Sequence, residues 1–280
     1  MPGMELYNDT CFECSKLITN KYSTSFSKGI KAFDKRFRAP IYAIYGFVRY
    51  ADEIVDTFHG HDQSLLMHDF KGQAFKAINE KISMNPVLQS FQSVVNTYHI
   101  EEGLIEAFLN SMEMDLHRKT YDAEGYTAYV HGSAEVIGLM CLRVFCENNE
   151  EQYQRLLPSA RSLGAAFQKV NFLRDIKEDH AERGRIYFPG VDFSNFTDDA
   201  KKHIETDIEK DFAKGFEGIR QLPDGVRLGV YLAYIYYNEL LKKISNSPAT
   251  IISRQRVRIT DISKTILYIR AVLKYKLTGI

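Results

Sequence analysis

Apolar residues recur at three- and four-residue spacing along most of the chain, as in Leu104, Phe108 and Met112. This is the period of an amphipathic α-helix, whereas the two-residue alternation typical of strands is almost absent. The pattern therefore predicts an all-α fold. The expected helices span residues 4–20, 34–57, 64–80, 86–97, 101–118, 124–147, 150–180, 197–219, 224–246 and 260–277.

The segments between these helices indicate a single domain over residues 1–280. Loops are expected around His59 and His61, at 84–86 and at 184–195. No repeat of fixed period, low-complexity segment or linker rich in Ser, Gly or Pro divides the chain. One helical bundle is the simplest organisation.

Composition narrows the class of protein. With 280 residues and 45% hydrophobic content, the chain has enough apolar surface for a substantial core. Its 36 basic and 36 acidic side chains balance, so no long-range field favours nucleic acid as a partner. The longest uncharged apolar run, 228–238, is shorter than the roughly 18 residues of a membrane span. We expect a cytoplasmic protein, at most peripheral to a membrane.

The cysteines are expected to be reduced thiols. Cys11 and Cys14 form a CxxC pair, and Cys141 and Cys146 a CxxxxC pair, in a chain without an N-terminal signal segment. A zinc site is the alternative reading. It is disfavoured because the second spacing is unusual and neither pair lies in a turn-rich knuckle.

Negative charge is concentrated in the stretch YADEIVD, residues 50–56, directly behind an apolar run. On a helix, Tyr45, Arg49, Asp52 and Asp56 are spaced 4, 3 and 4 apart and fall within about 60° of one another. Glu53 lies off this stripe and is expected to be solvated or structural. Carboxylates withdrawn from water need a cationic partner or a metal ion.

A second polar stripe follows in FQKVNFLRDIKEDHAERGRIYFP, residues 167–189. It comprises Gln168, Asn171, Asp175 and Asp179, spaced 3, 4 and 4 apart. Arg174 flanks the stripe, and Glu178 can point the same way. The helix also carries apolar residues for packing, so we expect it to be central.

One DxxxD pair alone is more typical of a solvated helix face with i,i+4 ion pairs. Two such stripes on separate helices favour a binding site. Carboxylate and amide oxygens suit a hard cation such as Mg²⁺, which keeps several waters and is usually completed by substrate phosphates. The two stripes therefore predict a diphosphate substrate.

Both stretches resemble the signatures of the squalene/phytoene synthase family, whose members join two prenyl diphosphates head to head. Other resembling segments are YSTSFS (22–27), FRAPIYAIYGFVRYADEIVD (37–56), MEMDLHRKTY (112–121), YVHGSAEVIGLM (129–140), YYNELLKKI (236–244) and SRQRVRI (253–259). The resemblance covers nearly the whole chain. It implies a helical bundle of the class I isoprenoid synthase type with a central cavity.

The resemblance also implies roles for single residues. The implied metal ligands are Asp52, Asp56, Asn171, Asp175 and Asp179, of which the four aspartates are the expected catalytic residues. The implied substrate-binding residues are Tyr22, Ser23, Thr24, Ser25, Tyr45, Arg49, Gln168, Arg174, Arg185 and Tyr237. Arg185 lies after a helix end, so it is equally well explained as a surface residue.

Two positions depart from the family pattern. Thr24 stands where many members have a basic residue, and Glu135 interrupts a run of small residues that packs helices closely. Neither is an expected metal ligand. The departures therefore bear on which substrate is bound and not on the type of reaction.

The implied reaction is Mg²⁺-dependent, with Mn²⁺ as a substitute, and joins two geranylgeranyl diphosphates through a cyclopropylcarbinyl diphosphate to phytoene. Aromatic residues near the motifs are Phe26, Tyr42, Tyr45, Phe47, Phe167 and Phe172, of which about a third are expected to line a cavity. Without a GxGxxG after a strand, no nicotinamide cofactor is predicted. An anchorless chain favours phytoene; the alternative is a farnesyl diphosphate-using relative that makes dehydrosqualene, presqualene diphosphate or squalene.

Two hypotheses of other classes stay open. A terpene cyclase also pairs acidic motifs, but closes one prenyl chain on itself. A non-catalytic assembly factor of the same fold would be expected to have lost the aspartates. The basic stretch 242–258 suggests membrane-surface contact or plain solvation. The resemblance implies a monomer that binds prenyl diphosphates.

Overall fold

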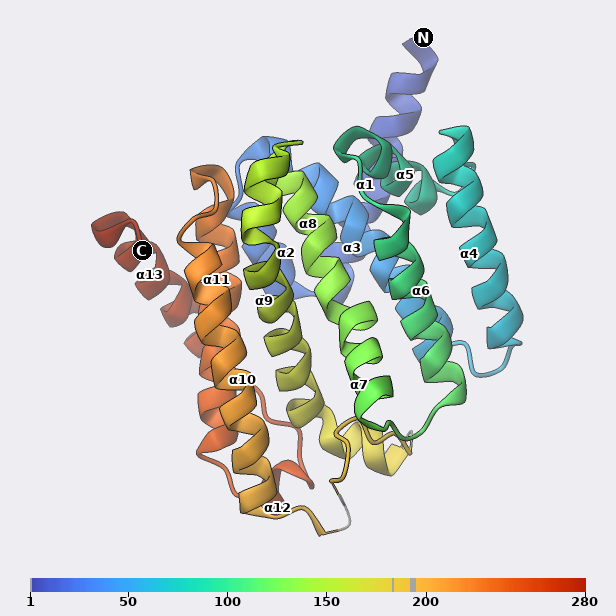
Figure 1. Ribbon diagram of the computed structural model, residues 1–280. Coiled ribbons are helices and arrows are strands. Elements are labelled where there is room, and N and C mark those ends of the chain that lie inside the picture. Colours follow the sequence, from blue (N-terminus) through green and yellow to red (C-terminus); the bar gives the residue numbers. More distant parts are fainter. Residues whose placement is uncertain (1, 183, 192–194) are drawn as a thin grey trace.

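The computed structural model describes residues 2–182, 184–191 and 195–280. Within these ranges the chain forms helices and no strand, and one isolated bridge pairs Thr120 with Ile186 (Figure 1). The helices are α1 Pro2–Tyr22, α2 Thr24–Lys31, α3 Lys35–Asp56, α4 Gln63–Glu80, α5 Pro86–Tyr98, α6 Glu102–His117, α7 Ala123–Val130, η1 His131–Glu135, α8 Val136–Cys146, α9 Glu150–Lys177, η2 Glu178–Glu182, α10 Asp198–Ile219, α11 Asp224–Ser245, α12 Ala249–Ile252 and α13 Asp261–Thr278. The predicted all-α class is confirmed.

Side-chain caps explain where many of these helices begin. At seven of the described helices, the side chain of the residue before the first turn accepts a hydrogen bond from a backbone N–H that would otherwise lack a partner. These capping residues are Ser23, Asp62, Asn85, Asp122, Asn149, Thr197 and Thr260. The boundaries expected from the apolar periodicity agree with the structure to within a few positions.

The structure differs from the prediction in four places, one of which is the four-residue helix α12 at Ala249–Ile252, where no helix was expected. Helix α2 was not expected, because its eight residues bury only Ser27 and Ile30 and so show too little periodicity. The predicted helix 124–147 contains a π-helical turn at η1, and the predicted helix 150–180 ends in another at η2. Part of the predicted loop 184–195 lies outside the described residues.

Two apolar cores hold the bundle together. The first lies among α3, α4, α5, α6 and α8, where the Phe47 ring stacks on Phe91 at 3.8 Å between centroids and also contacts Phe70 and Phe108. Burying each such ring contributes roughly 1.5–3 kcal/mol. The second core lies among α9, α10, α11 and the segments that follow them. Helices of both cores line one large cavity.

Glycines allow the central helices to approach closely. A Cβ at Gly164 of α9 would lie 2.8 Å from the carbonyl oxygen of Ala134, and one at Gly132 would lie 2.4 Å from that of Ala107. Helix α9 thus packs directly on η1, and also on α8, α10 and α11. Glu135 does not prevent this approach, because its carboxylate turns toward His131 and Arg161.

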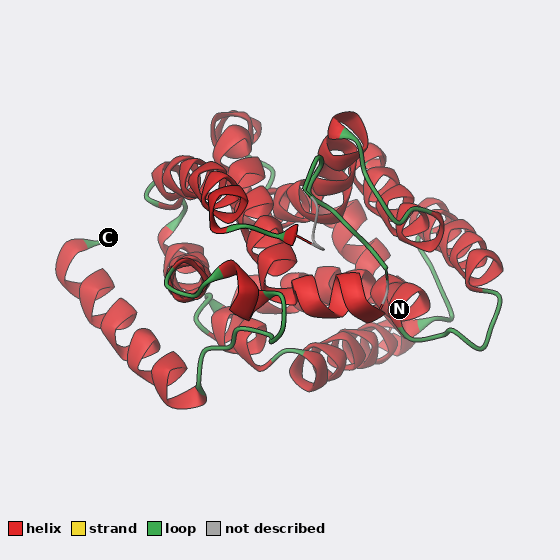
Figure 2. Ribbon diagram, turned by 90° about the horizontal axis from the view of Figure 1, so that it is seen from below, coloured by secondary structure: helices red, strands yellow, loops and turns green. Residues whose placement is uncertain are grey.

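Among the residues that the structure describes, one helical stretch is long and apolar enough to cross a membrane by length and composition. It spans Ala123–Cys146, and 67% of its apolar window is buried inside the bundle. The central helix of a globular core has the same properties. By contrast, α13 lies at the periphery of the bundle in both ribbon views (Figures 1 and 2).

Candidate active site

A cavity of about 890 Å³ lies between the two cores. Of the residues predicted for the site, it is lined by Tyr22, Ser23, Ser25, Tyr45, Arg49, Asp52, Asp56, Gln168, Asn171, Arg174, Asp175, Asp179, Arg185 and Tyr237. Thr24 is exposed on α2 and does not line the cavity. The fold therefore brings both acidic stripes to one space, although they are far apart in the sequence.

Helix α3 presents the first stripe with an arginine among its carboxylates. The Arg49 guanidinium pairs with Glu53, lies 3.9 Å from Asp52 and sits over the Tyr22 ring at 4.5 Å from its centroid. Glu53, expected to be solvated or structural, is largely buried in this ion pair and does not line the cavity. Burial raises the pKa of Asp52 to about 7; Arg49 opposes this shift and the neighbouring Asp56 adds to it.

Helix α9 and the π-helical turn η2 that follows it present the second stripe, where two arginines hold one carboxylate. Arg174 donates to both oxygens of Asp175, at 2.9 Å from Nε and 2.6 Å from Nη2. Arg256, from the segment after α12, reaches the same carboxylate at 2.8 Å and Glu178 at 3.2 Å. Paired hydrogen bonds of this kind fix a carboxylate in position.

Arg185 joins the two stripes. Its backbone N–H donates to the carbonyl oxygen of Asp179 at 2.7 Å, while its guanidinium lies 3.4 Å from the Asp56 carboxylate. The guanidinium also donates to the carbonyl oxygen of Asp115 at 3.1 Å. Only 10% of the side chain is exposed. The structure thus favours the site over the surface for this residue.

Asp115 is a site residue that sequence reasoning missed. Its carboxylate accepts hydrogen bonds from Tyr129 at 2.6 Å and Tyr121 at 3.2 Å, and lies 3.8 Å from Arg185. Burial raises the pKa of Asp115, and the charge of Arg185 and the Tyr129 hydroxyl oppose that shift. The sequence did contain one signal for Asp115. This carboxylate lies seven residues after Phe108 and therefore falls on the apolar stripe of its helix.

Arg256 is a second site residue that the sequence did not identify individually. It lies in the basic stretch 242–258, which suggested membrane contact or solvation. The structure instead turns this side chain into the cavity, against α9. No periodic signal marks it, because it follows α12 in a segment without helical structure.

Apolar and aromatic side chains form the rest of the cavity wall. Phe26 stacks on Tyr45 at 4.9 Å between centroids, and Phe167 stacks on Tyr237 at 4.2 Å. Further lining residues are Ile30, Phe33, Ile41, Phe145, Leu156, Phe172, Ile219 and Leu222. Of the six aromatic residues predicted near the motifs, Tyr42 and Phe47 belong to the core and the other four line the cavity, more than the third expected.

The polar end of the cavity fits a magnesium ion that is shared with a substrate phosphate. The Oδ1 atom of Asn171 is buried without a hydrogen-bond partner, while its Nδ2 donates to Gln168 at 3.3 Å. Across the described ranges, no three acidic, His or Cys side chains converge as a complete metal cage. Mg²⁺ usually takes one or two carboxylates and completes its octahedron with water and phosphate oxygens. The donor set available here matches that preference.

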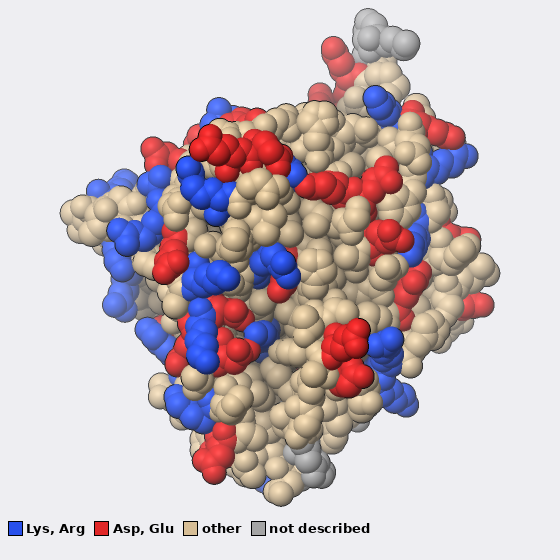
Figure 3. All heavy atoms as spheres, viewed as in Figure 1, with Lys and Arg blue, Asp and Glu red and all other residues tan. Residues whose placement is uncertain are grey.

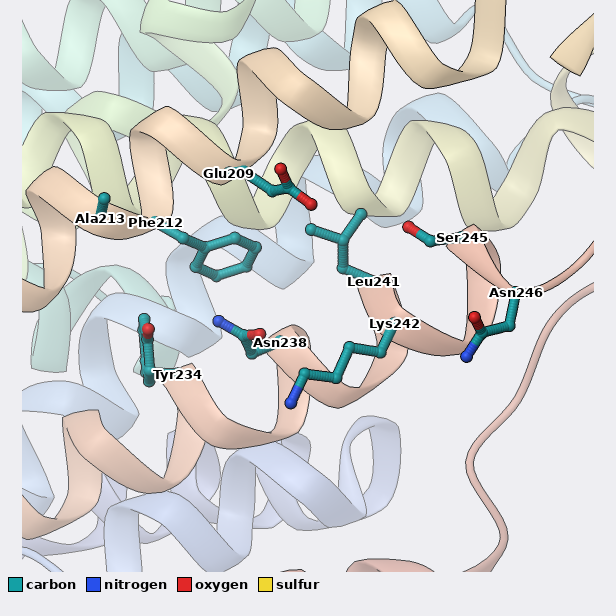
Figure 4. Close-up of a pocket in the computed structure, with 9 residues that line it drawn as sticks. All are labelled: Glu209, Phe212, Ala213, Tyr234, Asn238, Leu241, Lys242, Ser245 and Asn246. Carbon is teal, nitrogen blue, oxygen red and sulfur yellow. The ribbon is translucent and has the colours of Figure 1, made fainter. Parts of the chain in front are cut away.

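A second, smaller pocket lies between α10 and α11 (Figure 4). Its volume is about 340 Å³, and Glu209, Asn238 and Lys242 are among the side chains that line it. None of the predicted site residues reaches it. It presents a single carboxylate, so it lacks the paired oxygen ligands of the larger cavity.

Comparison with known proteins gives relatives that are similar over most of the chain. Over 261 residues the chain is 26% identical to the phytoene synthase of Arthrospira platensis, with 84% of each chain covered. Over 214 residues it is 25% identical to the 4,4'-diapophytoene synthase of Staphylococcus haemolyticus (strain JCSC1435), covering 74% of this chain and 72% of that one.

Solved structures show the same fold. A dehydrosqualene synthase in complex with a ligand superposes with a TM-score of 0.84 at 21% identity, covering 99% of this chain and 100% of that one. The squalene synthase HpnC from Alicyclobacillus acidocaldarius has a TM-score of 0.75 at 20% identity, covering 85% and 94%. The family model described as squalene/phytoene synthase matches residues 19–263, a range that includes both acidic stripes and Arg185. The chain therefore belongs to the squalene/phytoene synthase family of prenyltransferases.

Proposed function

We propose that this protein condenses two geranylgeranyl diphosphates head to head, through a cyclopropylcarbinyl diphosphate, to phytoene in carotenoid biosynthesis. The observation that carries the proposal is that both acidic stripes line one cavity and are joined there through Arg185. The remaining wall is largely apolar, which suits long prenyl chains. Family membership supports the head-to-head class of reaction.

The polar end supplies the groups that a diphosphate leaving group needs. Asp52, Asp56, Asn171, Asp175 and Asp179 would hold Mg²⁺ or a substitute Mn²⁺, which when bound supplies positive charge to the departing diphosphate. Arg49, Arg174, Arg185 and Arg256 line the same end. Their guanidinium groups stabilise the negative charge that develops as the allylic carbon–oxygen bond breaks and diphosphate leaves with the electron pair.

The apolar end protects the cation that remains. The allylic cation must be attacked by the double bond of the second substrate before water reaches it, so the wall must exclude water. The stacked pairs Phe26–Tyr45 and Phe167–Tyr237 line the cavity, and Tyr45 and Phe167 lie about one helical turn before Arg49 and Asn171. Aromatic ring faces stabilise a nearby cation by about 0.5–2 kcal/mol.

A farnesyl diphosphate-using activity is the alternative. The similarity to a 4,4'-diapophytoene synthase and the superposition on a dehydrosqualene synthase favour it, whereas the similarity to the Arthrospira phytoene synthase favours the C20 substrate. We keep the C20 substrate as the proposal. Tyr237, Arg174 and the α2 segment would bind the diphosphate group of either one.

The test supplies C15 and C20 diphosphates separately, with Mg²⁺ and with or without NADPH, and measures product mass. We expect a C40 hydrocarbon from the C20 substrate, formed without NADPH. A C30 product from the C15 substrate alone would replace the proposal by its alternative. A cyclic product of unchanged carbon number would indicate a terpene cyclase, and no product under any condition would favour an assembly factor.

A further inference from the structure

Helix α13 carries an exposed apolar stripe. The stripe consists of Ile262, Ile266, Ile269, Leu273 and Leu277, spaced 4, 3, 4 and 4 apart. At 100° per residue these side chains fall within about 80° of one another on one face of the helix. The exposed fraction of each is at least half, reaching 83% at Leu277. A run of this kind on one face marks an interaction site more than scattered apolar residues do.

The opposite face of α13 packs against the rest of the bundle. Ala271 points into the bundle and is 3% exposed, and the helix packs on α11. Lys264, Leu267 and Tyr268 line the large cavity. The apolar stripe is therefore turned away from the protein. In both ribbon views α13 lies at the outer edge of the bundle, where nothing in the described chain covers it (Figures 1 and 2).

Basic side chains border the stripe. On the helical wheel Arg270 and Lys276 fall on either side of it, each about 20° beyond its edge. Asp261 is the single acidic residue of α13. Figure 3 shows Lys and Arg side chains beside uncharged surface at the edge of the molecule where α13 lies. An apolar face bordered by Lys and Arg is typical of helices that lie in the interface of an anionic bilayer.

We propose that α13 docks the enzyme on an anionic lipid surface, with the stripe in the acyl boundary and Arg270 and Lys276 among the headgroups. The proposal rests on the proposed function, because prenyl substrates and a hydrocarbon product dissolve in membranes rather than in water. The helix that lies on the bilayer also forms part of the cavity wall through Leu267 and Tyr268. Prenyl chains can thus pass between cavity and bilayer beside α13.

A second copy of the chain fits the stripe less well. A helix of 18 residues is about 27 Å long, so a stripe about 10 Å wide offers on the order of 300 Å². Specific protein interfaces bury about 800 Å² on each partner. In a symmetric contact, Arg270 and Lys276 of one copy would also lie near the same residues of the other copy. Such contact between like charges is unfavourable. An anionic surface complements the same border.

The experiment floats the full-length protein on vesicles of phosphatidylcholine with or without phosphatidylglycerol. We expect binding to the anionic vesicles and at least a tenfold loss in the double variant Ile266→Ser/Leu273→Ser. The matched control is Leu6→Ser/Leu17→Ser, which removes two comparably exposed leucines from α1 and should bind like the parent. Arg270→Glu/Lys276→Glu should lose only the preference for anionic vesicles.

Measurements of turnover distinguish a failure of membrane docking from a failure of the proposed function. With prenyl diphosphates dispersed in detergent, Ile266→Ser/Leu273→Ser should match the parent, whereas with substrate embedded in vesicles it should be slower. Failure of the parent to float, an equal loss in the α1 control, or a dimer at micromolar concentration would overturn docking even if hydrocarbon forms. Floating with the expected variant pattern supports docking even if no hydrocarbon forms.

Discussion

Asp52 is both an expected metal ligand and a buried carboxyl group with a raised pKa, and a single substitution can separate these two properties. Its carboxyl faces the cavity near Asp56 and Arg49, and burial raises its pKa to about 7. In the unfolded chain an aspartate has a pKa of about 3.9. Between these two values the folded protein keeps a proton that the unfolded chain loses, so ionisation of Asp52 destabilises the fold increasingly as the pH rises from about 4 to about 7.

Asp52→Asn should therefore lower turnover while raising stability at alkaline pH. We expect about a 10²- to 10³-fold loss of product formation, because a charged carboxylate ligand of the cation that binds the diphosphate is replaced by a neutral amide. In EDTA at pH 8, urea unfolding should show a gain of about 1 kcal/mol over the parent, since a third of the side chain is exposed and solvent weakens the effect. The gain should vanish near pH 4.

Two further variants control this test. Asp175→Asn changes the second stripe and should lose product formation to a similar extent, while Asp69→Asn, on the exposed face of α4, should leave turnover unchanged. Full turnover in Asp52→Asn or Asp175→Asn would contradict the assigned ligand roles. A stability gain of the same size at pH 4 and pH 8 would contradict the ionisation argument.

At the scale of the element, the apolar periodicity predicted the features that repeat with the turns of a helix. Long amphipathic helices such as α3 and α9, and the stripe that each carries, were found because residues three and four apart share a face. Helix α2 and the two π-turns were not found, because eight residues bury too little and a π-turn interrupts the period of 3.6.

Site residues outside a repeated pattern were also not predictable. Arg256 reaches Asp175 from a segment that follows α12, and Asp115 contacts Arg185 although the two are 70 positions apart in the sequence. Such contacts depend on how the helices pack against one another. The spacing of residues along the chain does not encode that packing. Arg185 was named by family resemblance, but only the packing of its segment against α3 and α6 decides between the site and the surface.

The contact of α9 with η1 offers a test of element packing. Gly164→Ala should lower the free energy of unfolding by about 1–3 kcal/mol, because the added Cβ would lie 2.8 Å from the Ala134 carbonyl oxygen and the helices must separate. The matched control is Gly72→Ala on α4, where no atom lies within 4 Å of the added Cβ. Urea unfolding should show a gain of about 0.5–1 kcal/mol there. Equal effects at both sites would contradict the close approach.

At the scale of the whole molecule, the cavity separates the two cores, and its polar end is shared between α3 and α9. A ligand that spans this end adds contacts between the two cores and should stabilise the folded chain. Since no three acidic, His or Cys side chains of the described residues form a closed cage, Mg²⁺ and a diphosphate are expected to complete each other's coordination. Binding of the two should therefore be cooperative.

Thermal unfolding with a thiolodiphosphate analogue of the prenyl substrate measures this cooperativity. Mg²⁺ alone and the analogue alone should each raise Tm by about 1 °C or less. Both together, at about 100 times the dissociation constant of the analogue, should stabilise by about 2.7 kcal/mol, or about 5 °C for a chain of this size. EDTA should remove the joint shift, and Asp175→Asn should reduce it. A shift with Mg²⁺ alone as large as the joint shift would mean that the protein completes the metal site without the diphosphate.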